Sequence, residues 1–235
     1  MKANSFFKMA ALMLGMTISS VIFTSCTDED NPVGNVPGDV PNVGGTTVKE
    51  LSELTTAEVG WVIAADGKAY MNSAAAKAAN TEALAMFSCI TESVDGSHWG
   101  YAIQITDCPF MEVSWEEAKE YVKSLPEVEG ANWYLPDVAD WEEIFKGCAI
   151  TGDATERTDN SMKPINGFRD KMLAACPGWQ NAWYWTSAVE GSSNAWIVGF
   201  NLKTLYEGED ASASFANEPQ SYPYSVRGLL IFSKN

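Results

Sequence analysis

The sequence has few of the groups that hydrolytic and metal chemistry commonly require. It contains one histidine, His98, in 235 residues, and it lacks both a Gly-x-Ser-x-Gly motif and a Cys-x-x-Cys spacing. A single imidazole excludes zinc sites built from several histidines, and no serine lies in the turn that activates a hydrolase nucleophile. We therefore expect no enzyme activity, no cofactor and no metal site, and we interpret His98 as an ordinary surface residue.

Positive charge is also scarce. The chain has 15 Lys and Arg residues against 31 Asp and Glu residues, which gives a formal net charge of -16. Such a surface repels phosphate backbones, so a nucleic-acid partner is excluded. Because 46% of the residues are hydrophobic, the chain nevertheless has enough apolar side chains to build a folded core.

The first 25 residues have the pattern of a signal peptide. Lys2 and Lys8 precede an apolar run that is too short to span a membrane with confidence. Thr24 and Ser25 then precede Cys26, which resembles the lipidation site of bacterial lipoproteins, and the acidic run 27–30 resembles an export signal for the outer surface. The alternative is a plain secretory signal. We expect a lipoprotein anchored in the outer membrane through Cys26 and exposed at the surface of a Gram-negative bacterium.

Residues 26–56 are predicted to form a flexible tether that ends in a single folded domain, 57–235. The stretch from Asn31 to Val48 is rich in Pro, Gly, Val and Asn, has no Lys or Arg, and lacks apolar periodicity. Such a segment cannot bury enough apolar surface to offset the entropy cost of ordering. All nine Trp residues lie after residue 60, which places the core in the C-terminal part.

Periodicity predicts an α+β domain of short, mostly antiparallel strands with about three main helices and long loops. Ser114 and Glu117 form a capping box that starts one helix, Asp137 is a helix N-cap, and Pro177 follows a helix end. The predicted helices are 114–125, 137–148 and 165–176, with a short one at 73–79. The predicted strands are 61–63, 68–70, 83–90, 99–105, 183–187, 195–202 and 226–232, and the long connections are 149–163 and 203–225.

Six motifs in this order resemble the bacterial C-type-lectin-like domains related to the formylglycine-generating, or sulfatase-modifying, enzymes. They are Ser114-Trp115-x-x-Ala118, Trp133-x-Leu135-Pro136, Trp141, Tyr184-Trp185-Thr186-Ser187, Ala195-Trp196-x-Val198-x-Phe200 and Val226-Arg227. The resemblance implies a C-type-lectin-like fold on a surface lipoprotein. We expect Trp115, Trp133, Trp141, Trp185 and Trp196 to be core residues, because large aromatic side chains dominate core energetics.

The catalytic relatives in this superfamily use a cysteine pair near the C-terminus. This chain has no Cys after Cys176, so a sulfatase-modifying-type oxidase is disfavoured. Cys89, Cys108, Cys148 and Cys176 allow three disulfide pairings, between which the sequence does not choose. Calcium-dependent sugar binding is disfavoured too, because Glu218-Pro219-Gln220 resembles only half of the lectin calcium loop.

A recognition surface remains the favoured function. Tyrosines on Ser- and Asn-rich loops are typical of adaptable binding surfaces. The predicted ligand-binding residues are Trp179, Trp183, Tyr206, Tyr222 and Tyr224. We predict a non-catalytic module whose ligand is a glycan or a protein. The alternative from another class is a structural or adhesin subunit of a cell-surface assembly.

Overall fold

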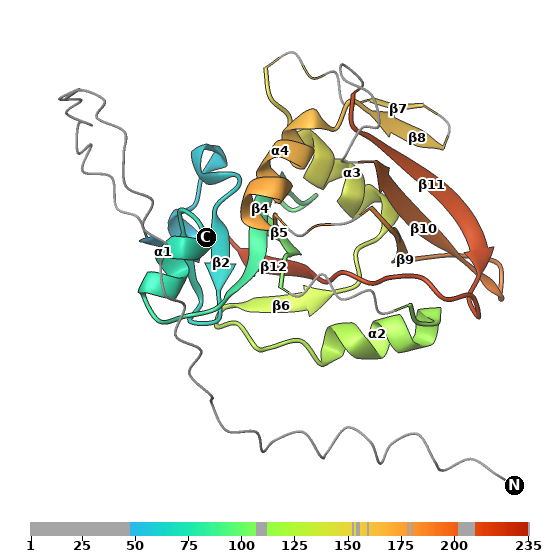
Figure 1. The fold of residues 1–235 in the computed structure, drawn as a ribbon, viewed down its shortest axis with the longest axis horizontal. Coiled ribbons are helices and arrows are strands. Elements are labelled where there is room, and N and C mark those ends of the chain that lie inside the picture. Colours follow the sequence, from blue (N-terminus) through green and yellow to red (C-terminus); the bar gives the residue numbers. More distant parts are fainter. Residues whose placement is uncertain are drawn as a thin grey trace, which may run out of the picture. The chain divides into compact units, whose positions relative to one another are not determined.

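The computed structural model describes residues 48–106, 112–151, 153, 156–158, 160–177, 179, 181–201 and 210–234. These residues form an α+β arrangement with two mostly antiparallel sheets and four α-helices (Figure 1). The predicted fold class is confirmed at this level. No described helix is long and apolar enough to cross a membrane.

The larger sheet has seven strands in the order β1-β3-β2-β4-β5-β12-β6. Its strands are β1 (Val48–Glu50), β2 (Val62–Ala64), β3 (Lys68–Tyr70), β4 (Ala83–Glu92), β5 (His98–Gln104), β6 (Ala131–Tyr134) and β12 (Leu229–Ser233). The predicted hairpin is confirmed, because β2 and β3 pair across the turn at Gly67, whose φ of 75° suits glycine. Strand β12 lies between β5 and β6, one strand in from the edge of the sheet.

The smaller sheet has five strands in the order β7-β8-β11-β10-β9. They are β7 (Glu156–Thr158), β8 (Ser161–Lys163), β9 (Trp183–Glu190), β10 (Asn194–Asn201) and β11 (Ser212–Pro219). The expectation that 149–163 and 203–225 lack regular structure was wrong, because these segments contain β7, β8 and β11. Strand β11 alternates buried Ala213 and Phe215 with the more open Ser212 and Ser214. Ala and Ser have low strand propensity, so pairing with β10 decides this structure.

The four helices lie where the sequence placed them. They are α1 (Ser73–Ala78), α2 (Trp115–Lys123), α3 (Val138–Gly147) and α4 (Asn166–Ala175). Both predicted N-caps are present: Ser114 closes a capping box with Glu117, and Asp137 closes one with Asp140. These side chains satisfy amide groups that the first turn of a helix leaves without partners.

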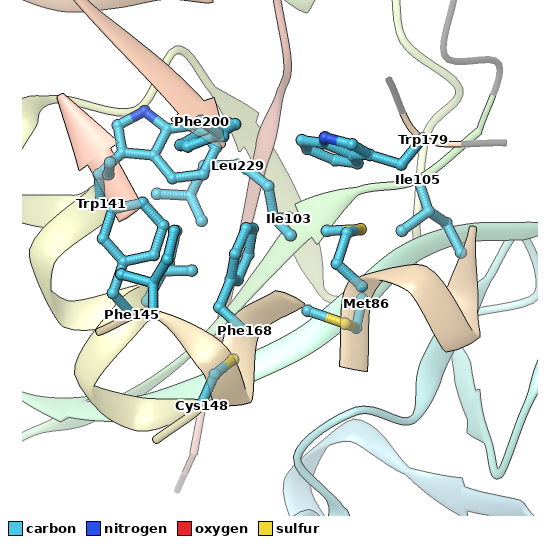
Figure 2. Close-up of a cluster of buried hydrophobic side chains, with 14 of the residues drawn as sticks. Met86, Ile103, Ile105, Trp141, Phe145, Cys148, Phe168, Trp179, Phe200 and Leu229 are labelled. Atoms are coloured by element: carbon cyan, nitrogen blue, oxygen red, sulfur yellow. The ribbon is translucent and has the colours of Figure 1, made fainter. Parts of the chain in front are cut away.

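Helices α3 and α4 lie between the two sheets and bury an aromatic cluster (Figures 1 and 2). Trp141 and Phe145 of α3 meet Phe168 of α4 and Phe200 of β10, with ring centroids 4.9 to 6.4 Å apart. Such spacing is favourable for aromatic pairs. This cluster is therefore the centre that joins both sheets.

The five tryptophans that we predicted to be core residues differ in burial. Trp141 and Trp185 have no exposed surface, which confirms their structural role. Trp115, Trp133 and Trp196 are partly buried and pack at the margins of the apolar clusters. Trp115 and Trp133 use their indole N–H groups to donate to the carbonyls of Thr186 and Pro126, at 2.8 Å each. These rings join elements rather than fill the centre.

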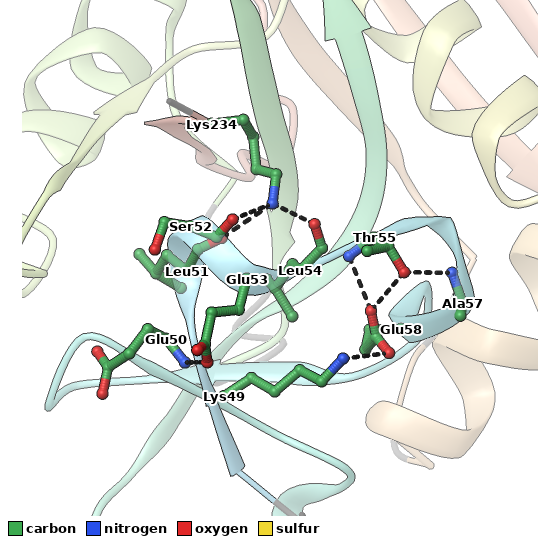
Figure 3. Close-up of polar contacts among 10 residues, drawn as sticks. All are labelled: Lys49, Glu50, Leu51, Ser52, Glu53, Leu54, Thr55, Ala57, Glu58 and Lys234. Atoms are coloured by element: carbon green, nitrogen blue, oxygen red, sulfur yellow. Dashed lines mark hydrogen bonds and ion pairs between the residues drawn. The ribbon is translucent and has the colours of Figure 1, made fainter.

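The folded body begins before residue 57, which corrects the predicted end of the tether at 56. Strand β1 pairs with β3, and Leu51 and Leu54 are buried around the 3₁₀ helix Leu51–Glu53. Figure 3 shows the Lys234 ammonium donating to the carbonyls of Leu51, Ser52 and Leu54. A cation near the C-terminus therefore fixes the segment by which the chain enters the domain.

Glu58 makes a second set of polar contacts in the same segment. Its carboxylate accepts from Lys49 Nζ at 2.7 Å and from the Thr55 backbone at 2.7 Å (Figure 3). Burial alone would raise the pKa of Glu58, but hydrogen bonds from Lys49 and Thr55 outweigh it and lower the pKa to about 2. The entry segment thus carries specific polar contacts, which a flexible tether would lack.

Candidate functional site: an aromatic groove beside helix α3

A groove of about 660 Å³ opens between α3 and one end of the larger sheet. We call it the aromatic groove, because three aromatic side chains belong to its lining. The lining residues are Thr91, Glu92, Ser93, Trp99, Tyr101, Tyr134, Ala139, Asp140, Glu143 and Ile231. Its volume lies in the range of ordinary small-molecule sites.

The strand register explains why the aromatic residues meet. Trp99 and Tyr101 are two residues apart on β5, so they share one face of the sheet. Tyr101 pairs with Ile231 of β12, and β12 in turn pairs Leu229 with Tyr134 of β6. The three aromatic residues thus come from β5 and β6, on either side of β12, and lie on one face of the sheet. Further along this face, Ile103 and Leu229 enter the buried cluster.

Exposure distinguishes these rings from the buried side chains on the same face of the sheet. Trp99 is 37% exposed and Tyr134 is 49% exposed, whereas Ile103 and Leu229 on the same sheet face are fully buried. Isolated apolar side chains at a surface are ordinary, but several aromatic rings around one groove are typical of a binding site. The apolar face of the sheet therefore extends beyond the helices that cover it.

Helix α3 supplies acidic groups to the opposite wall. Asp140 and Glu143 are three residues apart and therefore lie on one side of the helix. Asp140 Oδ2 accepts from the Asp137 backbone at 2.8 Å, which holds the carboxylate at the first turn. Burial raises the pKa of Asp140, despite the hydrogen bonds from Asp137 and Tyr101 that lower it.

Tyr101 lies in the groove lining together with Asp140 and Thr91. Burial, with the nearby Asp140 charge, raises the pKa of Tyr101 to about 12. The phenol is therefore neutral at physiological pH. The groove combines partly exposed ring faces with carboxylate and hydroxyl groups, and the lining residues that the structure describes include no Lys, Arg or His.

The described residues contain no cluster of three or more His, Cys, Asp or Glu side chains that could hold a metal ion. Cys89 and Cys148 are buried free thiols. Burial raises the pKa of both, in Cys148 to about 12, so neither is a reactive thiolate. Cys108 lies outside the described residues.

The structure separates the ligand-binding residues that the sequence predicted. Trp179 is fully buried against Phe168 and Tyr184, and the Arg227 guanidinium carbon lies 3.6 Å from the centre of its ring. The prediction that Trp179 contacts ligand was wrong, because its aromatic neighbours occupy that surface. Tyr206 and Cys26, the predicted lipidation residue, lie outside the described residues.

The other predicted residues occupy different environments. Trp183 is 40% exposed and lies against Gly199 on the adjacent strand, where it borders a shallow pocket of about 220 Å³. Tyr222 is 48% exposed. Tyr224 packs edge-on against Trp185, and burial raises its pKa. Neither Tyr222 nor Tyr224 lines the Trp183 pocket.

Sequence reasoning missed Trp99, Tyr101, Tyr134 and Asp140 as site residues. The signal was the alternation of Trp99 and Tyr101, which we interpreted only as an apolar strand. No family model, curated protein or solved structure matches this chain. The groove must therefore be interpreted from its own chemistry.

Proposed function

We propose that the folded domain is a non-catalytic glycan-binding module and that the aromatic groove holds the sugar. The observation that carries this proposal is the pair of exposed rings, Trp99 and Tyr134, beside the fixed polar groups Asp140 and Tyr101. Aromatic faces bury the C–H faces of sugar rings, and carboxylates and phenols bond sugar hydroxyl groups. A groove of about 660 Å³ accommodates a short oligosaccharide.

The positions of the acidic groups favour binding over hydrolysis. Glycosidases usually place two carboxyl groups on opposite sides of the bond that breaks, one as acid and one as base or nucleophile. Here Asp140 and Glu143 belong to the helix wall, and the third acidic lining residue, Glu92, is exposed at the end of β4. The support for recognition without turnover is that Glu143 is ion-paired with Lys146 at 3.2 Å and that Asp140 accepts a hydrogen bond from the Asp137 amide.

The proposed fold is C-type-lectin-like. Its support is the order of the six motifs together with the observed α+β arrangement of two antiparallel sheets. We further propose that the domain is presented at the cell surface by a lipid on Cys26. The support is the charged and apolar pattern of residues 1–25, the small residues before Cys26 and the acidic run after it.

The test is a glycan array on residues 48–235, with and without Ca²⁺, followed by titration of the ligands that bind. Tyr134→Ala should weaken binding about tenfold, because it removes one of the exposed aromatic rings that line the groove. Tyr222→Ala is the matched control, because Tyr222 has nearly the same exposure as Tyr134 but does not line the groove. Absence of glycan binding, or loss of binding only in Tyr222→Ala, would contradict the proposal.

A further inference from the structure

The charge of the aromatic groove restricts which sugar it accepts, provided that the groove is the glycan site proposed above. Glu92, Asp140 and Glu143 form part of its lining, and among the residues that the structure describes no Lys, Arg or His lines it. The whole chain also carries a formal net charge of -16. An acidic glycan would therefore meet repulsion both in the groove and at long range.

The negative charge of the helix wall is only partly neutralised. Glu143 pairs with Lys146, but about half of each side chain is exposed, and such surface pairs interact weakly. Asp140 accepts a hydrogen bond from the Asp137 amide, which is a neutral group, and it lies in the lining with the neutral Tyr101. A ligand that brings a positive charge would supply the counter-charge that this wall lacks.

The opposite side of the groove suits the same ligand. The faces of Trp and Tyr rings carry negative potential and attract ammonium groups, most strongly where water is partly excluded. Trp99 and Tyr134 have surface available for such contact, and Tyr101 remains neutral beside them. Aromatic rings on one side and carboxylates on the other form a setting for a cation.

We propose that the aromatic groove selects glycans that carry a positively charged amine, with the ammonium group between the Trp99 and Tyr134 rings and the carboxylates of Asp140 and Glu143. The sugar ring supplies the apolar face that lies on the aromatics. The amine supplies the charge that distinguishes this ligand from a neutral or acidic sugar of the same size.

The experiment compares four tetrasaccharides by titration at neutral pH and low salt. They are β-1,4-linked tetramers of N-trimethylglucosamine, whose charge is permanent, of N-acetylglucosamine and of glucose, and an α-1,4-linked tetramer of galacturonic acid. The trimethylammonium tetramer should bind about tenfold more tightly than the N-acetyl tetramer. The acidic tetramer should bind most weakly, and added salt should weaken only the cationic complex.

Three charge variants test whether the preference for the cationic tetramer arises in the groove. Glu143→Gln and Glu120→Gln each remove one carboxylate from a surface pair with a lysine three residues later, but only Glu143 lines the groove. Glu143→Gln should reduce the preference for the cationic tetramer several-fold, whereas Glu120→Gln should leave it unchanged. Asp140→Asn, which keeps an oxygen to accept from the Asp137 amide, should also reduce it.

The outcomes separate the two proposals. Equal binding of the cationic, N-acetyl and glucose tetramers would overturn the charge preference and leave glycan binding intact. A cationic preference that survives in Glu143→Gln, in Asp140→Asn and in Glu92→Gln, the third acidic lining residue, would also overturn it, because the charge would then act elsewhere. Failure of every tetramer and of the wider array would overturn the proposed function itself.

Discussion

The two ends of helix α3 meet the larger sheet in different ways. At the C-terminal end, Gly147 lies so close to β4 that an added Cβ would be 2.1 Å from Cys89 Cβ and 2.8 Å from the Ser88 carbonyl oxygen. At the N-terminal end, Asp140 and Glu143 line the aromatic groove. Helix α3 therefore packs closely against the sheet at its C-terminal end and borders the groove nearer its N-terminal end. The side chains at each position determine this difference.

The aromatic residues on the core side of α3 and at the groove also differ. Trp141 packs against Phe145, Phe168 and Phe200, and it has no exposed surface. Trp99 and Tyr134 keep more than a third of their surface exposed. Burial on the core side stabilises the fold, whereas exposure at the groove leaves apolar area for a ligand. Residue type alone does not distinguish these roles.

The largest expected effect concerns the core side of helix α3. Trp141→Ala should lower the free energy of unfolding by about 3 to 5 kcal/mol, because it leaves a cavity among rings that cannot collapse. Tyr134→Ala, at the groove, should cost about 1 kcal/mol. Urea denaturation of both variants measures the difference. Similar losses for the two would contradict the distinction between core and groove.

A smaller effect tests the close contact of α3 with β4. Gly147→Ala should lower the free energy of unfolding by about 1 to 3 kcal/mol, since the new methyl group must displace the helix from Cys89. Gly130→Ala is not a neutral control, because its φ is 76°. Ala139→Gly, on the same helix at the groove, controls for helix propensity, with an expected cost of about 1 kcal/mol. A stabilising effect of Gly147→Ala would show that the helix is not in close contact there.

The smallest effect concerns two acidic residues at equivalent helix positions. Hydrogen bonds from Ser114 lower the pKa of Glu117, whereas burial raises the pKa of Asp140. Ionised Glu117 therefore stabilises the fold above the pKa that it has in the unfolded chain, and this contribution is lost as the pH falls through its lower folded value. Ionised Asp140 makes the opposite contribution to the free energy of unfolding. Its charge destabilises the fold as the pH rises through the raised pKa that it has in the folded chain.

Thermal unfolding of Glu117→Gln and Asp140→Asn as a function of pH measures these contributions. Glu117→Gln should be less stable than the wild type at neutral pH and should approach it in acid. Asp140→Asn should equal or exceed the wild type at neutral pH, and the gain should disappear in acid. If Asp140→Asn lost stability at neutral pH and regained it in acid, the inferred burial of the Asp140 charge would be wrong.

Helices and their boundaries could be predicted because their signals are local. Ser114, Glu117 and Asp137 identify helix starts by side-chain bonds within one turn. Strand β11 could not be found in this way, since its Ala and Ser residues favour a strand only beside β10. Membership of β1 in the larger sheet likewise depends on pairing with β3, about twenty residues further along the chain.

The groove could not be predicted from local sequence patterns, because it too depends on long-range strand pairing. Trp99, Tyr134 and Asp140 come together through β12, the last strand, which inserts between β5 and β6. Trp179 illustrates the opposite error, because a tryptophan beside glycine in a predicted loop is fully buried by helix α4 and the smaller sheet. Where an aromatic residue lies therefore depends on long-range packing.

The most direct measurement is a nuclear magnetic resonance titration of the labelled domain with the cationic tetrasaccharide. The Trp99 indole N–H and the backbone amides of 139–143 should shift together and saturate with one affinity, while the buried indole N–H of Trp141 remains unaffected. Saturable shifts confined to Trp183 and Tyr222 would place the ligand on the surface predicted from the sequence and would contradict the aromatic groove as the binding site.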